Sequence, residues 1–322
     1  MGPGDLTKIM KNLKIKKDKR VIIGAENADD SAVVMVGKEK ILQTADIITP
    51  IVEDPFIFGQ IAAANALSDV YAMGGKPVSV LNIACFPVDC LDLKILEDIF
   101  LGGLSKIEEA GACLVGGHTV IDKEIKYGLS VVGISGENIF HNALAKEGLD
   151  IILTKPLGGG IVSTALKAEM VEKEHRTEML NFMTRLNKYS AEVAEKTGII
   201  TMTDITGFGL LGHLLEVLKA SNISARIYKE KVPFMSGFDL YISYGLIPAG
   251  AYRNKEFVEN YTNGEKEWVL KLSAPETSGG LLIFCEKNKT ERILSNIKEN
   301  GDPMASFIGE TIKLEESHIY LV

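Results

Sequence analysis

The stretch TDITGFGLLGH, residues 203–213, places a carboxylate and two glycines between two apolar segments. The preceding GIITMT has the composition of a strand, and the apolar spacing of LLGHLLEVL predicts a helix packed on a sheet. Asp204 would then lie at the carboxyl end of a strand, where ligands collect in α/β folds, and Gly207 and Gly209 would let a backbone approach a ligand closely. The alternative is that Asp204 or Thr206 caps the helix, and the spacing alone leaves both interpretations open.

Further acidic residues stand in the N-terminal part of the chain. Asp29 and Asp30, in ENADDSAVV, open a predicted strand, and Asp46, in LQTADIITP, closes its hairpin partner. Each of them could be an ordinary turn or cap residue. Asn65 and Asp69 are four residues apart in an alanine-rich segment, so they share one face of a predicted helix and other backbone can approach that face closely. The alternative for this pair is a solvent-exposed stripe on the helix.

Two glycine-rich joints could bind phosphate. LVGGHT, residues 114–119, and LTKPLGGG, residues 153–160, each end a predicted strand and could present free backbone N–H groups to phosphate oxygens. Neither has the spacing of a GxxxxGK[ST] loop or a GxGxxG fingerprint, so a plain turn is the alternative. His118 and His213 at such places are more often structural than catalytic. Carboxylates together with phosphate-binding joints would suit Mg²⁺ and a nucleotide, because Mg²⁺ prefers carboxylate and phosphate oxygens.

Length and composition limit the classes of protein. A chain of 322 residues, 46% of them hydrophobic, predicts two globular domains with ample core. The net charge of −8 argues against a general nucleic-acid binder, and the only concentrated basic run, residues 8–20, could be a solvated face. We find no apolar stretch long enough for a membrane span and no signal peptide, so we expect a cytoplasmic protein that binds neither nucleic acid nor membrane.

None of the four cysteines is a candidate for catalysis or zinc binding. Cys85, Cys113 and Cys285 lie in apolar, strand-like runs and are predicted to pack in the core. Cys90 is predicted to be more exposed, but no neighbouring base or cation would lower its pKa. We therefore assign no catalytic cysteine.

The elements that must position these residues fall into two α+β units. The first begins with a hairpin that turns at Gly37 and Lys38, followed by the helix PFIFGQIAAANALSDVYAMGG, a strand, a second helix and two strands, and it closes near residue 136. The second begins with the strand and helix of IILTKPLGGGIVSTALKAEM, and continues through two helices, the Asp204 strand and helix, and three later strands. We predict domains at residues 1–140 and 141–322.

The sequence resembles the selenophosphate synthetases, which belong with aminoimidazole ribonucleotide synthetase and thiamine monophosphate kinase in one ATP-binding superfamily. The resemblance covers nearly the whole chain. It rests on NADDSAV, the block from Gln43 to Pro77, GGHT, LTKPLGGG, TDITGFGLLGH and TSGGLL, in this order. The block from Gln43 to Pro77 and TDITGFGLLGH are typical of the selenium enzymes rather than of their purine and thiamine relatives.

The resemblance implies a function and a set of site residues. Members of the family convert ATP, hydrogen selenide and water into selenophosphate, AMP and orthophosphate, and bind the ATP phosphates through several Mg²⁺ ions. They have two α/β domains of the aminoimidazole ribonucleotide synthetase-like type and form homodimers through their N-terminal domains. The implied Mg²⁺ ligands are Asp30, Asp69 and Asp204. The implied nucleotide-binding residues are Asn27, Ala28, Asp29, Asp46, Asp69, Gly117, His118 and Thr119.

The sequence departs from the family pattern at two places. Where members of the family have Asp-Pro-Gln before TSGG, this chain has Ala274, Pro275 and Glu276, which we interpret as local tuning of a turn. The family also carries a reactive cysteine or selenocysteine, followed closely by a lysine, in a glycine-rich mobile segment that would lie upstream of Met1. We therefore expect no catalytic residue of that kind within the printed sequence.

Two further hypotheses stay open beside the enzyme. The chain could be a non-catalytic nucleotide-binding paralogue that acts as a partner or regulator, or a relative that phosphorylates another acceptor. The aspartate set favours the enzyme, because a protein that only binds partners need not keep every metal ligand. We also expect residues 8–20 to be poorly ordered without nucleotide and to close over the triphosphate as a lid.

Overall fold

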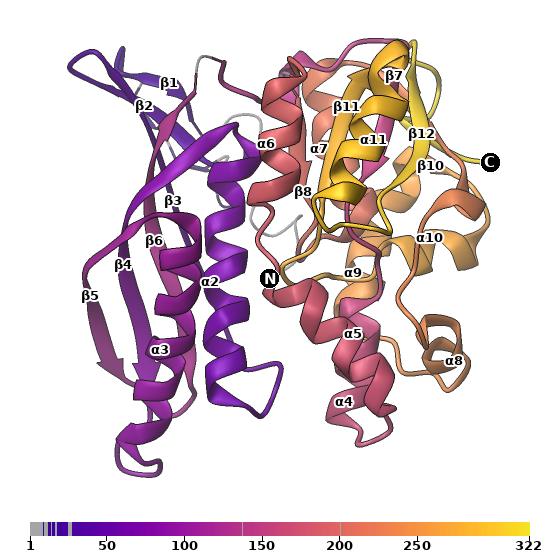
Figure 1. Ribbon diagram of the computed structural model, residues 1–322. Helices are drawn as coiled ribbons and strands as arrows, with labels where there is room; N and C mark the ends of the chain where they lie inside the picture. Colours follow the sequence, from indigo (N-terminus) through magenta and orange to yellow (C-terminus); the bar gives the residue numbers. More distant parts are fainter. Residues whose placement is uncertain are drawn as a thin grey trace.

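The computed structural model describes residues 9, 12–13, 15–16, 18–24, 28–136, 138–199 and 201–322. Within them the chain forms two α/β units, each built on one mixed sheet (Figure 1). The elements of the first unit are β1 (Val21–Ile23), β2 (Ala32–Val36), β3 (Glu39–Ile48), α2 (Pro55–Ala72), β4 (Gly75–Phe86), α3 (Leu93–Ala110), β5 (Cys113–Ile121) and β6 (Lys126–Ser135). Their strands lie in the order β1-β2-β3-β6-β4-β5.

The second unit is also built on one mixed sheet, which has seven strands. Its strands are β7 (Leu149–Leu153), β8 (Met202–Asp204), β9 (Ser224–Ile227), β10 (Thr262–Asn263), β11 (Leu281–Glu286), β12 (Ser306–Ile312) and β13 (Ile319–Leu321), in the order β10-β13-β9-β12-β7-β11-β8. Its α-helices are α4 (Gly159–Lys167), α5 (Lys173–Thr184), α6 (Lys188–Lys196), α7 (Gly209–Ser221), α8 (Phe238–Ser243), α9 (Ala249–Val258), α10 (Lys266–Leu272) and α11 (Thr290–Glu299).

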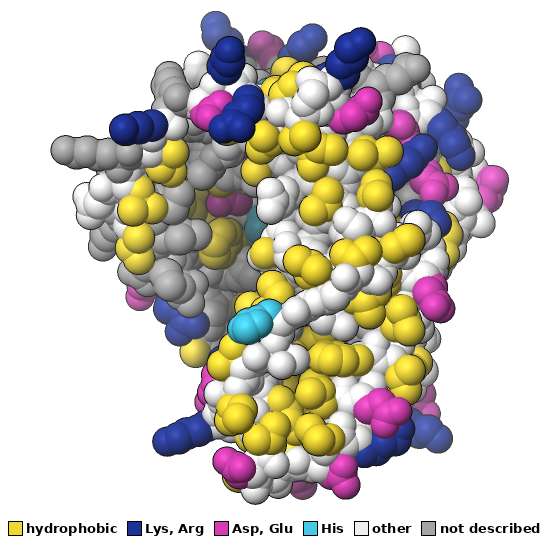
Figure 2. Space-filling view, turned by 90° about the vertical axis from the view of Figure 1, so that its left-hand side faces the viewer, with side chains coloured by type: hydrophobic (Ala, Val, Ile, Leu, Met, Phe, Trp, Pro, Cys, Tyr) yellow, Lys and Arg dark blue, Asp and Glu magenta, His cyan; other side chains and the backbone are white. Residues whose placement is uncertain are grey.

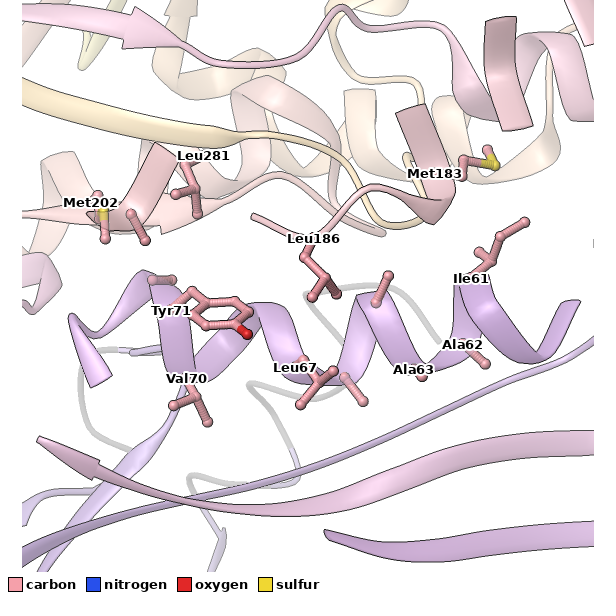
Figure 3. Close-up of a cluster of buried hydrophobic side chains, with 14 of the residues drawn as sticks. Ile61, Ala62, Ala63, Leu67, Val70, Tyr71, Met183, Leu186, Met202 and Leu281 are labelled. Atoms are coloured by element: carbon pink, nitrogen blue, oxygen red, sulfur yellow. The ribbon is translucent and has the colours of Figure 1, made fainter. Parts of the chain in front are cut away.

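Helix α2 lies between the two units and is buried along most of its length. Its N-terminus is set by Asp54, whose side chain accepts a hydrogen bond from the Ile57 N–H, and by Pro55 at the first turn. Figure 3 shows Leu67 and Val70 on the side of the helix that faces the first sheet, and Ile61 on the side of Met183. Because both sides of α2 pack against apolar neighbours, the helix holds the two units against one another.

Small residues let the two helices of the first unit approach closely. A Cβ on Gly59 would collide with the backbone of Ile99 on α3, and a Cβ on Gly102 would collide with the backbone of Phe56 on α2. The apolar surface of this pair covers one face of the first sheet, with Val80 and Leu129 among the buried residues of the core.

The opposite face of the first sheet has no helix over it among the described residues (Figure 1). Every residue of the edge strand β5 is exposed, and the exposed apolar side chains on this face include Val120 on β5 and Leu81 on β4. Figure 2, which looks onto this side of the molecule, shows hydrophobic side chains gathered across it. We call this surface the open sheet face.

The structure confirms the predicted hairpin at Gly37 and Lys38 and the order of the predicted elements in both units, and it adds elements that were not predicted: β1 in the first unit, and β10, β13 and α8–α11 in the second. It corrects the prediction for Cys113, which is exposed on β5 rather than packed in the core, because that edge strand has no covering layer; Cys85 is only half-buried. Cys285 is buried and Cys90 is exposed, as predicted. Among the described residues, none of the helices has the length and apolarity needed to cross a lipid bilayer.

Candidate functional site

Four aspartates from four separate segments act on one another electrostatically. Asp30 lies two residues before β2, Asp46 lies on β3, Asp69 lies on α2, and Asp204 is the last residue of β8. The charge of Asp204 raises the pKa of each of the other three, and the charges of Asp46 and Asp30 also raise the pKa of Asp69. The structure thus brings together acidic residues that are up to 174 positions apart, counting from 30 to 204. We call Asp30, Asp46, Asp69 and Asp204 the aspartate cluster.

Three of these carboxylates accept a hydrogen bond on one oxygen from a neutral side chain. The donors are two threonine hydroxyls and one asparagine amide, and none of them carries a charge. The bonds are Thr203 Oγ1 to Asp30 Oδ1 at 2.9 Å, Asn65 Nδ2 to Asp46 Oδ2 at 2.6 Å, and Thr44 Oγ1 to Asp69 Oδ2 at 2.5 Å. Neutral donors orient a carboxylate without neutralising it, so these bonds leave the negative charge of the cluster uncompensated.

Burial and mutual repulsion raise the pKa values of the cluster. Burial is the largest cause for Asp30 and Asp69, whose pKa values lie well above the ordinary 3.8, with neighbouring carboxylates adding to the shift. The same two causes raise the pKa of Asp46 to about 6. Burial also raises the pKa of Asp204, while the nearby charges of His213 and Lys155 lower it. Such a cluster is stabilised by bound cations.

The donor set fits Mg²⁺. Oδ2 of Asp30 and Oδ2 of Asp204 are buried and accept no hydrogen bond from any described residue, so each offers a free carboxylate oxygen. Among the described residues, no three His, Cys, Asp or Glu side chains converge closely enough to hold one ion by themselves. Mg²⁺ is commonly held by one or two carboxylates together with substrate phosphates, so a site that also needs phosphate oxygens agrees with this arrangement.

Asp204 does not cap helix α7. The N-cap residue of that helix is Phe208, and no side chain forms a cap hydrogen bond there. The Thr206 hydroxyl instead lies 3.2 Å from Nε2 of His213, whose ring stacks on Phe208 and whose Nδ1 is 3.4 Å from Glu216. The interpretation of Asp204 as a cap is therefore wrong, and the predicted strand before it is shorter, since β8 begins at Met202.

The face of α2 that carries Asn65 and Asp69 is a contact between the units rather than a solvent-exposed stripe. Asn65 is buried, and while its amide Nδ2 donates to Asp46, its Oδ1 accepts a hydrogen bond of 2.9 Å from the Ser278 N–H in the second unit. One turn further along, the Ser68 hydroxyl accepts a 2.8 Å bond from Asn187 Nδ2. Asn65, Ser68 and Asp69 thus connect the aspartate cluster to the second unit.

The predicted nucleotide-binding residues near position 28 are held by the segment that follows the first unit. The Asn142 N–H donates to Asp29 Oδ1 at 2.7 Å, and its side-chain amide donates to the Ala28 carbonyl at 3.0 Å. Ala28 has a φ of 52°, a left-handed conformation that is uncommon for alanine and that these bonds hold in place. Asn27 lies outside the described residues.

Gly117, His118 and Thr119 occupy a different setting from the one predicted. They lie inside β5, which runs on to Ile121, and pair with β4 instead of ending a strand. A shift in the register of β4 and β5 near Gly116 absorbs one extra residue, and the strand continues past the glycines. The three residues are exposed on an edge strand, so their backbone is accessible from the outer side.

In the glycine-rich segment at residues 153–160, backbone N–H groups donate hydrogen bonds to a side chain of the protein itself. The two carboxylate oxygens of Glu276 accept hydrogen bonds from the N–H groups of Gly158 and Gly159, both at 2.7 Å. The N–H groups at the start of α4 therefore already have acceptors within the fold, and the phosphate-binding interpretation of LTKPLGGG is wrong. The departure from the family pattern at Glu276 fits this contact, because a glutamine would present an NH2 donor, rather than a second oxygen acceptor, to one of the two N–H groups.

Several residues of the site were not assigned from the sequence. These are Thr44, Ser68, Lys155, Asn187 and Thr203. A signal existed for two of them: Thr44 lies two positions before Asp46 on the same face of a strand, and Thr203 directly precedes Asp204. Asn187 and Lys155 give no local signal, because their partners are distant in sequence. Residues 8–20 fall partly outside the described residues, and their predicted role as a lid stays a prediction.

The comparisons with known proteins agree with the fold and the resemblance. Residues 28–135 match the family described as AIR synthase related protein, N-terminal domain, and residues 146–322 match the corresponding C-terminal domain. Among solved structures, a complex of HypE with HypF has a TM-score of 0.74 at 16% identity, with coverage of 100% of this chain and 97% of that one. A thiamine monophosphate kinase, ThiL, complexed with AMPPCP and TMP has a TM-score of 0.69 at 20% identity, with coverage of 99% and 93%. These likenesses confirm the predicted fold.

Curated relatives are much more similar in sequence. "Selenide, water dikinase 2" of Peptoclostridium acidaminophilum is 43% identical over 327 residues, which cover 100% of this chain and 94% of the relative. "Selenide, water dikinase" of Clostridioides difficile strain 630 is 44% identical, covering 99% and 93%. The enzyme of that name from Geobacter sp. strain M21 is 45% identical, covering 96% and 91%. The chain therefore belongs to the selenide, water dikinase family of AIR synthase related proteins.

Proposed function

We propose that this protein makes selenophosphate from selenide, ATP and water, and releases AMP and orthophosphate. The names and full-length similarity of its relatives support the reaction. The observation that carries the site assignment is the aspartate cluster, in which both units contribute buried carboxylates held by neutral donors.

We assign the Mg²⁺ ions to Asp30, Asp69 and Asp204. Bound Mg²⁺ would neutralise charge on the triphosphate and on the attacking selenide anion. The protein's own part is to orient the carboxylates: Thr203 and Thr44 each hold one oxygen, so that the other oxygen faces the ion. The nucleotide is assigned to Asp46 and Asp69, and to the segments around Ala28 and Thr119, which are Asn27, Ala28, Asp29, Gly117, His118 and Thr119.

We further propose a homodimer formed through the open sheet face. The exposed side chains of Val120 on β5 and Leu81 on β4 form an apolar surface next to an unpaired strand edge. Monomeric proteins rarely expose such a surface, and a free edge strand is a hazard for aggregation unless it is covered. A second copy of the chain covers both features at once. A cytoplasmic location stays a prediction.

Calorimetric titration with Mg²⁺ and ATP tests the metal assignment. We expect Asp30→Asn, Asp69→Asn and Asp204→Asn each to weaken Mg²⁺-dependent ATP binding by at least about tenfold, because a neutral amide is a poor ligand for a hard cation. Asp89→Asn, an exposed aspartate on the turn after β4, is the matched control and should bind as the unaltered protein does. Unchanged affinity in all three site variants would refute the assignment.

A second measurement separates the enzyme from its alternatives. AMP formation that depends on added selenide supports selenophosphate synthesis. Tight binding of ATP without AMP formation, in a chain extended upstream by the family's reactive segment with cysteine at the reactive position, would instead favour the non-catalytic nucleotide-binding protein. Nucleotide turnover that needs another acceptor would favour the relative with a different substrate.

A further inference from the structure

The hydroxyl of Thr203 connects the two units at the aspartate cluster. Thr203 lies on β8 in the second unit, and its Oγ1 is 2.9 Å from Oδ1 of Asp30 in the first unit. The threonine side chain is buried, at 2% exposure. Oδ2 of the same aspartate is buried and accepts no hydrogen bond from any described residue. The contact therefore holds one carboxylate oxygen and leaves the other available.

The single proton of the hydroxyl has two acceptors within reach. One is Asp30 Oδ1 at 2.9 Å, and the other is the Asp204 carbonyl oxygen at 3.4 Å. The carboxylate is closer and carries the charge, so it receives the stronger bond. Thr203 thus sets the rotation of the Asp30 carboxylate about its side chain, although it belongs to the other unit.

A second hydroxyl makes the reciprocal contact. The hydroxyl of Ser68, on α2 of the first unit, acts on the carboxylate of Asp204 in the second unit and lowers its pKa. The Ser68 oxygen accepts a 2.8 Å hydrogen bond from Asn187 Nδ2, whose second proton goes to the Gly279 carbonyl, also at 2.8 Å. Each unit therefore places a hydroxyl group near an aspartate of the other.

We propose that Thr203 is a positioning residue which holds Asp30 ready for a divalent cation and makes cation affinity depend on the docking of the two units. The inference rests on the proposed function, because it takes Asp30 and Asp204 as cation ligands. It goes beyond that function by assigning to neutral residues the task of linking domain docking to metal binding.

A purely structural role for Thr203 would have a different signature. A hydrogen bond that only fastens the two units would change the stability of the metal-free protein and leave the cation affinity of the folded protein unchanged. A positioning role changes the cation affinity, and does so only while the Asp30 carboxylate is present. The interaction between the two positions therefore distinguishes the two roles.

The test is a double-mutant cycle on the full chain with Mn²⁺ as the probe. Binding is measured by the electron paramagnetic resonance signal of free Mn²⁺, in the presence of the non-hydrolysable analogue AMPPCP. Thr203→Val removes the hydroxyl at nearly constant volume, and Thr203→Ser is the matched control that keeps it. We expect T203V to bind Mn²⁺ about tenfold more weakly and T203S to stay within about twofold, since a hydrogen bond to a charged group contributes roughly 1.5 kcal/mol.

The Asp30→Asn background completes the cycle. D30N alone should lose affinity, and adding T203V to D30N should cause no further loss. Wild-type affinity in T203V, or a tenfold loss that persists in D30N, overturns the inference while leaving the metal assignment in place. Wild-type affinity in D30N overturns the metal assignment itself. Urea unfolding without metal shows that each variant is folded, and Thr203→Ala, which introduces no bulk, replaces T203V in the same cycle if the valine prevents folding.

Discussion

Glu276 and Gly158 form a buried carboxyl–helix contact: one carboxyl oxygen of Glu276 lies 2.7 Å from the Gly158 N at the start of α4, and its second oxygen lies 2.7 Å from the Gly159 N. The first N–H groups of a helix have no partner within the helix, and these two oxygens accept hydrogen bonds from two of them. The loop that carries Glu276 is further tied to the site through Ser278, whose N–H bonds to Asn65. The contact therefore supports the geometry of the aspartate cluster.

Replacing Glu276 with alanine should destabilise the protein. The substitution leaves the N–H groups of Gly158 and Gly159 buried without an acceptor and opens a cavity, so we expect the free energy of unfolding to fall by about 2–4 kcal/mol. Urea unfolding followed by circular dichroism measures the change. Glu53→Ala, at an exposed position before α2, is the control and should lie within about 0.5 kcal/mol of the unaltered protein. Equal stability of E276A and E53A would show that this contact contributes little.

The same residue predicts a pH dependence. Burial raises the pKa of Glu276 from 4.5 to about 8, against the lowering effect of the backbone N–H groups. The folded state then binds this proton more tightly than the unfolded state, so its contribution to stability is present below about pH 4.5 and is lost as the pH rises towards 8. Glu276→Gln cannot ionise, and its stability relative to the wild type should increase from pH 5 to pH 8.5. A constant difference in unfolding free energy across this interval would show that the carboxyl group titrates normally.

Cation binding should stabilise the protein more at neutral than at acidic pH. Burial and the charge of Asp204 raise the pKa of Asp46 to about 6, and Asp30 and Asp69 are raised as well. Without cations the folded state loses stability as the pH rises from about 4 through 6, because the carboxylates become charged together. Ligands must be ionised to bind, so Mg²⁺ with ATP should raise the melting temperature more at pH 7.5 than at pH 5. An equal rise at both pH values would contradict a role for these carboxylates, and Mg²⁺ removal by a chelator should reverse the effect.

A charge on the open sheet face should weaken the proposed dimer. Val120 on β5 is 49% exposed on this face, so Val120→Glu should fold as the unaltered chain does while the dimer dissociates at least about tenfold more readily. Analytical ultracentrifugation over a range of concentrations measures the association. Met170→Glu is the matched control, since Met170 is 48% exposed after α4 in the second unit and should leave association unchanged. A wild-type chain that stays monomeric, or equal association of V120E, would refute this interface.

Local patterns in the sequence predicted the elements whose partners are near in the chain. The turn at Gly37 and Lys38 needs only two adjacent strands, and the register of β2 against β3 follows from it. The apolar spacing after Gly209 was sufficient for α7, and the strand before Asp204 was recognised although its start was placed too early. The motifs and their order also led to the correct family, because they extend over nearly the whole chain.

The partners of the site residues were decided only by the tertiary structure. Glu276 reaches Gly158 across 118 positions, and Thr203 reaches Asp30 across 173, so neither contact leaves a trace in local spacing. The exposure of Cys113 was also decided by the tertiary structure. Its apolar sequence predicts a strand in the core, but the order of strands places β5 at an edge of the sheet that no layer covers. By itself the sequence determined most helices and strands of the first unit and those on either side of Asp204, because backbone periodicity is a local property, and the resemblance to a family indicated which aspartates to test as Mg²⁺ ligands. The tertiary structure decided which donor orients each carboxylate and which glycine joint is already filled, because these depend on how two separately folded sheets dock on the two sides of α2.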